Sequence, residues 1–156
     1  MATARCLIKV SPEVAFTYLS DLTRHGEWAI NPGLALEQSS PGPIEPGTTF
    51  RSRGTQFGLN LEDEVTVTAL ESPHRFAFEA RPQKGPMVRN GQTMLIRHAF
   101  DFHREDSGVM VTKGTEIVQG PAFFRLTRPL TELVLRRRLQ KDLKRIAARL
   151  ESKGAQ

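Results

Sequence analysis

From about Ala122 onward, the apolar residues of the chain recur at intervals of three and four, which is the repeat of one face of an α-helix. The residues of this stripe are Leu126, Leu130, Leu133, Val134, Leu135, Leu139, Leu143, Ile146 and Leu150. A stripe of this length needs an apolar partner surface, because leaving it in water is unfavourable. The pattern predicts one long C-terminal helix that packs on the rest of the chain.

The segments before this helix carry the signals of short strands joined by turns. Apolar and polar residues alternate with the two-residue period of a strand that buries one face. The alternating stretches are residues 3–10, 48–54, 61–70, 75–81, 94–104 and 109–118. Strands that are joined by short turns pair antiparallel. We therefore expect an α+β fold, with a curved antiparallel sheet of about seven strands wrapped around the long C-terminal helix.

Two short helices are expected directly after the first strand. Ser11 offers a hydroxyl cap, and Pro12 suits the first helical position, where no amide donor is needed. This helix should run to about Leu19, and a second should end near Trp28. The order predicted is strand, two short helices, further strands and one long helix.

Length and composition indicate one ordinary globular domain that spans residues 1–156. Hydrophobic residues make up 38% and charged residues 25% of the chain, which is typical of a folded domain with a core. Cys6 is the only cysteine, so an internal disulfide and a thiolate metal cluster are excluded. The start of the chain lacks a secretory signal, and no window approaches the roughly 18 to 20 apolar residues of a membrane span. We expect a cytoplasmic protein.

Several short motifs, in their order along the chain, carry a resemblance to a known family. They are Ser11-Pro12-Glu13 with Phe16, Tyr18-Leu19-Ser20-Asp21 with Trp28, Gly47-Thr48, Leu70-Glu71-Ser72-Pro73, and the terminal helix after Gly120-Pro121. With these motifs the chain resembles the START-like or SRPBCC superfamily, in particular its polyketide cyclase/dehydrase branch. The resemblance implies a helix-grip fold. It also implies a cavity under the last helix that binds a lipid, polyketide, sterol or other hydrophobic compound.

Two polar residues share strand faces with apolar residues that are expected to line such a cavity. Asp63 has the parity of Val65 and Val67, and His98 has that of Phe100. Inside an apolar chamber, a carboxyl and an imidazole suit proton transfer to or from a ligand carbonyl. They are the candidate catalytic residues. Alternatively, Asp63 pairs with an arginine near a sheet edge and His98 is a satisfied core histidine.

The candidate ligand-binding residues are aromatic and aliphatic side chains expected to face the cavity. They are Phe16, Trp28, Phe50, Phe57, Phe76, Phe78, Phe100, Phe123, Leu126 and Leu130. Flat rings suit a flat or polyene-like ligand. The alternative is that these rings pack on one another. His25 and Glu27 either face the cavity mouth or belong to a solvated turn.

The basic charge of the chain is concentrated in its last segment. Residues 125–153 hold ten basic and three acidic side chains, among them Arg136, Arg137 and Arg138. Such a face either attracts anionic lipid headgroups or is a solvated outer face that interleaves with the leucines. A weak contact with anionic membranes is left open, whereas the lack of accompanying aromatic residues speaks against nucleic acid.

Three hypotheses of function follow. The first is binding of a hydrophobic small molecule between the sheet and the C-terminal helix. The second is a cofactor-free cyclase or dehydratase that uses Asp63 and His98 as acid and base. The third is a membrane-associated lipid- or quinone-binding chaperone. The histidines show no metal-ligand spacing, so we expect no metal and no cofactor, in a monomer or homodimer.

Overall fold

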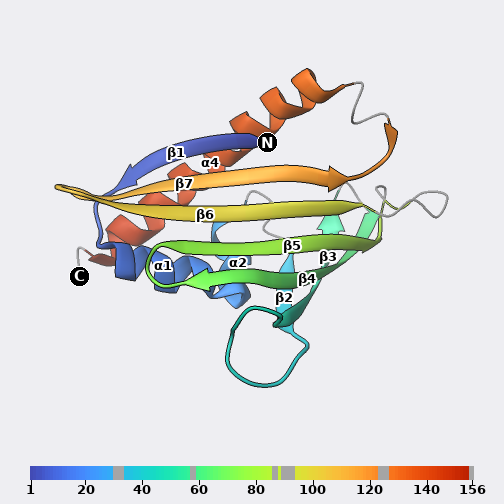
Figure 1. The fold of residues 1–156 in the computed structure, drawn as a ribbon, viewed down its shortest axis with the longest axis horizontal. Coiled ribbons are helices and arrows are strands. Elements are labelled where there is room, and N and C mark those ends of the chain that lie inside the picture. The colour runs from blue at the N-terminus through green and yellow to red at the C-terminus, as the bar shows by residue number, and fades with distance from the viewer. Residues whose placement is uncertain (30–33, 57–58, 86–87, 89–93, 123–126, 155–156) are drawn as a thin grey trace.

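The structure, a computed structural model, describes the chain except for residues 30–33, 57–58, 86–87, 89–93, 123–126 and 155–156. The strands are β1 (Ala2–Ile8), β2 (Ala35–Gln38), β3 (Thr49–Gln56), β4 (Leu59–Glu71), β5 (Arg75–Lys84), β6 (Leu95–Glu105) and β7 (Gly108–Gln119). They form one antiparallel sheet in the order β1-β7-β6-β5-β4-β3-β2 (Figure 1). The first strand thereby pairs with the last, which leaves β1 and β2 at the edges.

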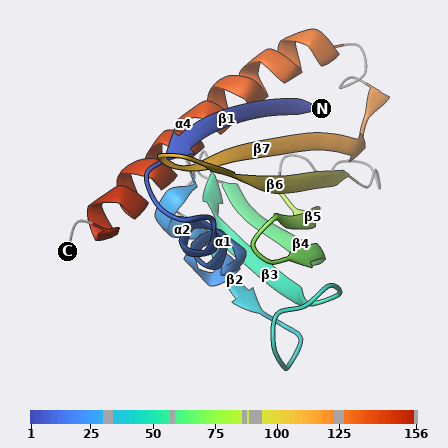
Figure 2. The same cartoon turned by 60° about the vertical axis from the view of Figure 1, so that its left-hand side comes forward.

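The helices confirm the predicted order of elements. α1 (Pro12–Ser20), the 3-10 helix η1 (Leu22–Arg24) and α2 (His25–Trp28) follow β1, and α4 (Arg128–Gly154) follows β7. The sheet curves, and α4 runs diagonally along the side that also holds α1 and α2 (Figure 2). This arrangement is the α+β helix-grip fold that the sequence predicts.

Local sequence explains where the first helices begin. Ser11 accepts a hydrogen bond from the backbone N–H of Val14 at 3.4 Å, and Pro12 occupies the first turn. Asp21 then accepts a hydrogen bond from the backbone N–H of Thr23 at 3.1 Å, which caps η1. The cap at Asp21 explains why the helical segment restarts after α1, as the sequence predicts.

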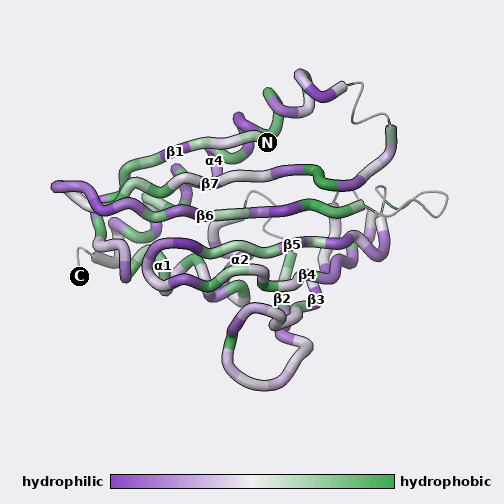
Figure 3. Tube along the Cα trace, in the orientation of Figure 1, coloured by the Kyte–Doolittle hydropathy of each residue, from purple (hydrophilic) through white to green (hydrophobic). Residues whose placement is uncertain are grey.

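The long helix is anchored most firmly over its second half. Leu139, Leu143, Ile146 and Leu150 are all at most 4% exposed. Nearby, Nη1 of Arg145 donates a hydrogen bond to the carbonyl of Ala29 at 3.1 Å, which ties α4 to the end of α2. Hydrophilic and hydrophobic segments alternate along the helix (Figure 3), as expected for an amphipathic helix on a sheet.

The first turns of α4 depart from the predicted stripe. Leu130, Leu133 and Val134 are 64%, 47% and 57% exposed. The reason is geometric, because this end of α4 extends past the start of β1, where the sheet no longer lies beneath it (Figure 1). The helix begins at Arg128, and residues 123–126 of its predicted start lie outside the described residues.

The sheet has the predicted seven strands, but the position of one of them was not predicted. β2 comprises only Ala35–Gln38, and within it Leu36 alone is buried. Four residues with a single buried side chain give no alternation to detect. Among the described helices, none is long and apolar enough to cross a membrane.

Candidate functional site

A cavity of about 260 Å³ lies between the inner face of the sheet, α2 and α4. Apolar side chains supply most of its wall. They are Ala29, Leu34, Leu36, Leu61, Val65, Phe78, Ala80, Pro82, Met94, Ile96, Ile117, Leu135 and Leu139. They come from the sheet and from the helices, so the chamber exists only where these layers meet.

A buried ion pair forms part of this wall. Nζ of Lys113 donates a hydrogen bond to Oδ2 of Asp142 at 2.6 Å, and the two side chains are 5% and 8% exposed. Lys113 lies on the inner face of β7 together with Val109, Val111 and Thr115. Asp142 follows Leu139 by three positions on the buried stripe of α4. The pair therefore joins the sheet to the helix.

Two aromatic rings lie close to the ammonium group of Lys113. Its Nζ lies 4.8 Å from the centroid of the Trp28 ring and 5.4 Å from that of Phe100, in cation–π geometry. Burial lowers the pKa of Lys113, and the opposing effect of Asp142 offsets part of that shift. The chamber thus contains an amine that is held away from water.

The predicted residue His98 projects into the same chamber. Its Nδ1 lies 3.0 Å from Oγ1 of Thr115, and its ring stacks on Phe78 with centroids 4.8 Å apart. Burial, and after it the charge of Lys113, lowers the pKa of His98 to about 3. The imidazole is therefore neutral at physiological pH and has one nitrogen free of its proton.

His25 is the second histidine of the chamber. It is held in α2 with its ring 4.4 Å from Trp28. Burial and the charge of Lys113 lower its pKa to about 4, and its Nδ1 has no hydrogen-bond partner among the described residues. Of the two interpretations offered by the sequence, the solvated turn is wrong for His25. Glu27 instead accepts a hydrogen bond from the hydroxyl of Tyr18 at 3.0 Å.

Asp63 lines the chamber from β4, opposite Ser52 of β3. Burial raises its pKa, and the carboxyl makes no ion pair with a described residue. The pairing of β4 with β5 shifts register between Glu62 and Asp63. Such irregularities redirect side chains and are frequent beside functional sites. Asp63 and His98 therefore reach one chamber from different strands.

The predicted apolar residues that the structure describes separate into three groups. Phe78 lines the chamber, whereas Phe16, Trp28, Phe50, Phe76 and Phe100 form the buried core beside it and are at most 5% exposed. Within this core, Trp28 meets Phe100 edge-on at 5.7 Å. Leu130 is exposed on the first turns of α4. Phe57, Phe123 and Leu126 lie outside the described residues.

Sequence reasoning missed Lys113, Arg138 and Asp142, which all line the chamber. The strand parity of residues 109–117 already places Lys113 on the buried face, and Asp142 has the helical spacing of the buried leucines. The signal is a charged residue inside an apolar pattern. Whether Lys113 and Asp142 form an ion pair depends on how α4 is positioned along the sheet. A pattern within one segment of the sequence does not contain that information.

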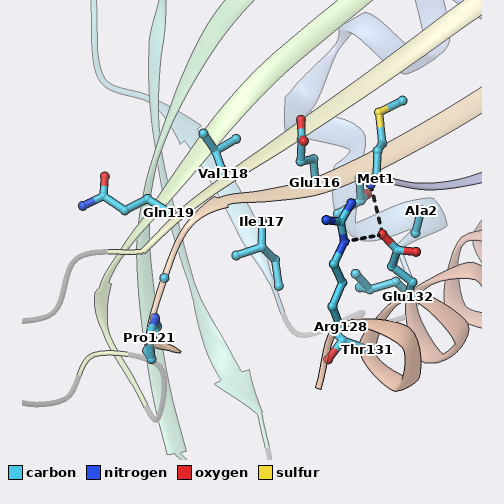
Figure 4. Close-up of a pocket in the computed structure, with 13 residues that line it drawn as sticks. Met1, Ala2, Glu116, Ile117, Val118, Gln119, Pro121, Arg128, Thr131 and Glu132 are labelled. Atoms are coloured by element: carbon cyan, nitrogen blue, oxygen red, sulfur yellow. Dashed lines mark hydrogen bonds and ion pairs between the residues drawn. The ribbon is translucent and has the colours of Figure 1, made fainter. Parts of the chain in front are cut away.

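A second hollow, of about 410 Å³, opens beside the first (Figure 4). It lies between β1, the end of β7 and the first turns of α4. Here Glu132 accepts from Nε of Arg128 and from the amino group of Met1, both at 3.2 Å. Thr115, Ile117 and Leu135 line both hollows, so the two spaces meet at these side chains.

No group of three or more metal-ligating side chains occurs in the part of the chain that the structure describes. The ionisable side chains that line the chamber are His25, Asp63, Lys84, His98, Lys113, Arg138 and Asp142.

A curved antiparallel sheet that holds a long helix over an apolar chamber defines the START-like, or SRPBCC, class of proteins. Within this class, the chain belongs to the family described as polyketide cyclase/dehydrase and lipid transport, whose model matches residues 2–151. A comparison with curated protein sequences gives no match.

Solved structures share the fold at low sequence identity. A conserved protein from Geobacillus kaustophilus has a TM-score of 0.72 at 12% identity, over 96% of this chain and 94% of that one. Ara h 8.0201 has a TM-score of 0.67 at 13% identity, over 96% of both chains. The di-domain ARO/CYC StfQ from the steffimycin biosynthetic pathway has a TM-score of 0.70 at 14% identity, over 99% of this chain and 51% of that one. At these identities the likeness concerns the fold.

Proposed function

We propose that this protein binds a small, largely apolar molecule in the chamber between the sheet and α4. The observation that carries the proposal is the cavity itself, which is apolar over most of its wall and has a volume of about 260 Å³. An apolar cavity of about 150 Å³ is sufficient for benzene. Pockets for drug-sized ligands begin at about 300 Å³. The size therefore favours a compound of one or two rings, or a short chain.

The polar groups of the wall would orient this molecule. Arg138 makes no ion pair with a described residue, and Lys113, His98 and Asp63 face the same space. A few polar groups in an apolar pocket typically fix the orientation of a ligand. A ligand with an apolar body and one oxygen-bearing end satisfies both parts of the wall.

Filling the chamber tests the proposal. In the variant Ala80→Phe, a phenyl ring occupies space in the chamber, and we expect affinity for an environment-sensitive apolar dye to fall at least tenfold. Arg81→Phe is the matched control, because Arg81 neighbours Ala80 but is exposed and does not line the chamber. Native mass spectrometry of the purified wild type should reveal any ligand that remains bound. Equal dye affinity in the wild type and Ala80→Phe would contradict the proposal.

A second candidate function is acid–base catalysis on the bound molecule by Asp63 and His98. The observation in its favour is that burial raises the pKa of Asp63 while it lowers that of His98 to about 3. Burial thus favours the neutral acid at one position and the neutral base at the other. These are the forms that proton transfer to and from a carbonyl compound requires.

Substitution of both residues separates catalysis from binding. In Asp63→Ala and His98→Ala we expect turnover of a cyclisation or dehydration substrate to fall by about 10² to 10⁴, the usual contribution of general acid–base catalysis. Dye affinity should remain close to that of the wild type. Turnover that survives both substitutions would refute these roles.

A further inference from the structure

Lys113 is one of the groups expected to orient the ligand, but that role does not require a buried amine. A ligand-binding pocket of this class needs an apolar wall and a few hydrogen-bonding groups, and a neutral side chain would serve for these. Yet this chain places an amine in the chamber, 5% exposed and close to the rings of both Trp28 and Phe100. Burial of an ion pair is costly compared with apolar side chains of the same volume. The position therefore suggests a chemical use.

Lys84 provides a comparison within the same chain. It also lines the chamber, but its side chain is 72% exposed and lies 3.1 Å from Glu62 in an ion pair. An exposed side chain in an ion pair gains no activation from desolvation. Lys113 differs, because its apolar surroundings disfavour the charged form and lower its pKa. Desolvation of this kind is one of the ways in which proteins activate lysine amines.

Asp142 is placed to carry the proton that such a reaction displaces. Its Oδ2 lies 2.6 Å from Nζ of Lys113, and its side chain is 8% exposed. Proton transfer between two groups at this distance needs no intervening water. The carboxylate and the amine come from α4 and β7, the two layers that enclose the chamber.

We propose that Lys113 forms a reversible imine with an aldehyde or ketone bound in the chamber, and that Asp142 carries the proton. This inference rests on the proposed function, because the carbonyl compound must first occupy the cavity. An aldehyde or ketone on a one-ring apolar body suits both the volume of the chamber and its wall.

The step balances without any further reactant. Asp142 takes a proton from the ammonium group of Lys113, and the freed lone pair of Nζ attacks the carbonyl carbon. The C–N bond forms while the electrons of the C=O double bond move to oxygen. That oxygen receives the nitrogen's second proton and the proton held by Asp142, the C–O bond breaks, and water leaves. The product is an iminium cation beside the Asp142 carboxylate, in contact with the rings that now flank Nζ.

Trapping by reduction tests the proposal with benzaldehyde as the probe. The full-length protein is incubated with benzaldehyde and then with borohydride, which converts an imine into a stable secondary amine. Peptide mapping by mass spectrometry then measures labelling at each of the six lysines, Lys9, Lys84, Lys113, Lys141, Lys144 and Lys153. We expect at least tenfold more labelling at Lys113 than at any other lysine. Equal or lower labelling at Lys113 would overturn the inference.

Matched variants separate the imine from a purely structural role of the pair. Lys113→Arg keeps the positive charge opposite Asp142 and should lose the label. Lys141→Arg should keep it, because Lys141 is exposed and does not line the chamber. Asp142→Asn should slow labelling of Lys113 at least tenfold, after normalisation to the folded fraction measured by circular dichroism. A Lys113 that labels at the wild-type rate in Asp142→Asn would contradict the role of Asp142 as proton carrier.

Benzyl alcohol distinguishes failure of this inference from failure of the proposed function. The alcohol has the size of the aldehyde but cannot form an imine. If benzyl alcohol displaces the apolar dye and Lys113 stays unlabelled by benzaldehyde, the chamber binds ligands and the imine is wrong. If neither compound displaces the dye and no label appears, both the binding function and the imine are wrong.

Discussion

Lys113 and Asp142 are the residues at which stability and chemistry compete most directly. Their side chains are almost fully buried, and each lies within a surface that is otherwise apolar. Removing one member of such a pair leaves the other charge buried, which costs about 3–5 kcal/mol, whereas replacing both with apolar residues is often neutral. The pair is therefore expected to reduce tolerance to single substitutions without being needed for the fold.

A double-mutant cycle measures this coupling. We expect Lys113→Met to lower the free energy of unfolding by about 3–5 kcal/mol, and Lys113→Met with Asp142→Leu to restore most of it. Urea unfolding followed by circular dichroism gives the values. A double variant that is as unstable as the sum of both single variants would show that the pair is not energetically coupled.

The two half-buried histidines of the chamber make the folded state sensitive to acid. The pKa of His98 falls from 6.5 to about 3 and that of His25 from 6.5 to about 4 on folding. The unfolded chain therefore takes up protons as the pH drops through 6.5, while the folded chain does not. The stability that depends on the two histidines being neutral is fully present above pH 6.5. As the pH falls from 6.5 toward their pKa values in the folded state, the free energy of unfolding drops by about 1.4 kcal/mol per pH unit for each histidine.

Urea unfolding between pH 7 and pH 5 checks this dependence. His98→Gln removes one titrating group, so the fall in the free energy of unfolding over this range should become shallower. His103→Gln is the control, because His103 is exposed on the same strand. An identical pH dependence in the wild type and in His98→Gln would show that His98 does not contribute.

Strand parity was sufficient to place Asp63 and His98 on chamber-facing sides, because the two-residue period of a strand fixes the side of every residue. It did not separate residues that line the cavity from those that fill the core. Phe76 and Phe78 share a cluster, yet only Phe78 borders the chamber. That difference depends on how the layers are spaced, which a pattern within one strand does not contain.

At the scale of single elements, α4 is anchored unevenly. Leu143 is fully buried on the sheet, whereas Leu133, ten residues earlier on the same helix, is 47% exposed. The periodicity of the sequence is the same at both positions and predicts the helix correctly. It cannot tell where the sheet beneath the helix ends, since that depends on the position of β1.

Two alanine substitutions compare the ends of this helix. Leu143→Ala should destabilise the protein by about 2–5 kcal/mol, because it leaves a cavity in a packed site. Leu133→Ala should change stability by less than about 0.5 kcal/mol, as is usual for surface positions. Chemical unfolding measures the free energy of unfolding of both variants. A similar loss of stability in the two would contradict the uneven anchoring of α4 on the sheet.

At the scale of the whole molecule, local patterns predicted the order of elements, whereas the chamber was expected only from the family resemblance. The six alternating stretches and the final helical stripe specify an α+β fold, because each pattern is local. The cavity arises where residues of α2, six strands and α4 converge, among them Ala29, Ser52 and Leu139. The volume of the cavity therefore cannot be predicted from any single segment of the sequence.

Ligand binding should stabilise the folded molecule as a whole. At a free concentration 100 times its dissociation constant, a ligand of the chamber adds about 2.7 kcal/mol to the apparent free energy of unfolding. We expect a saturable rise in Tm with a bound apolar ligand for the wild type and little rise for Ala80→Phe. A rise of the same size in both would locate the binding elsewhere.

The uneven anchoring of α4 also bears on how its backbone exchanges hydrogen with solvent. Where buried leucines are absent, a short opening of the helix breaks few contacts, so the amides of residues 128–134 are expected to exchange faster than those of residues 139–150. The first turns of α4 border both hollows through Leu135. Local opening at this end would therefore admit a molecule from outside while the far end of the helix stays in place.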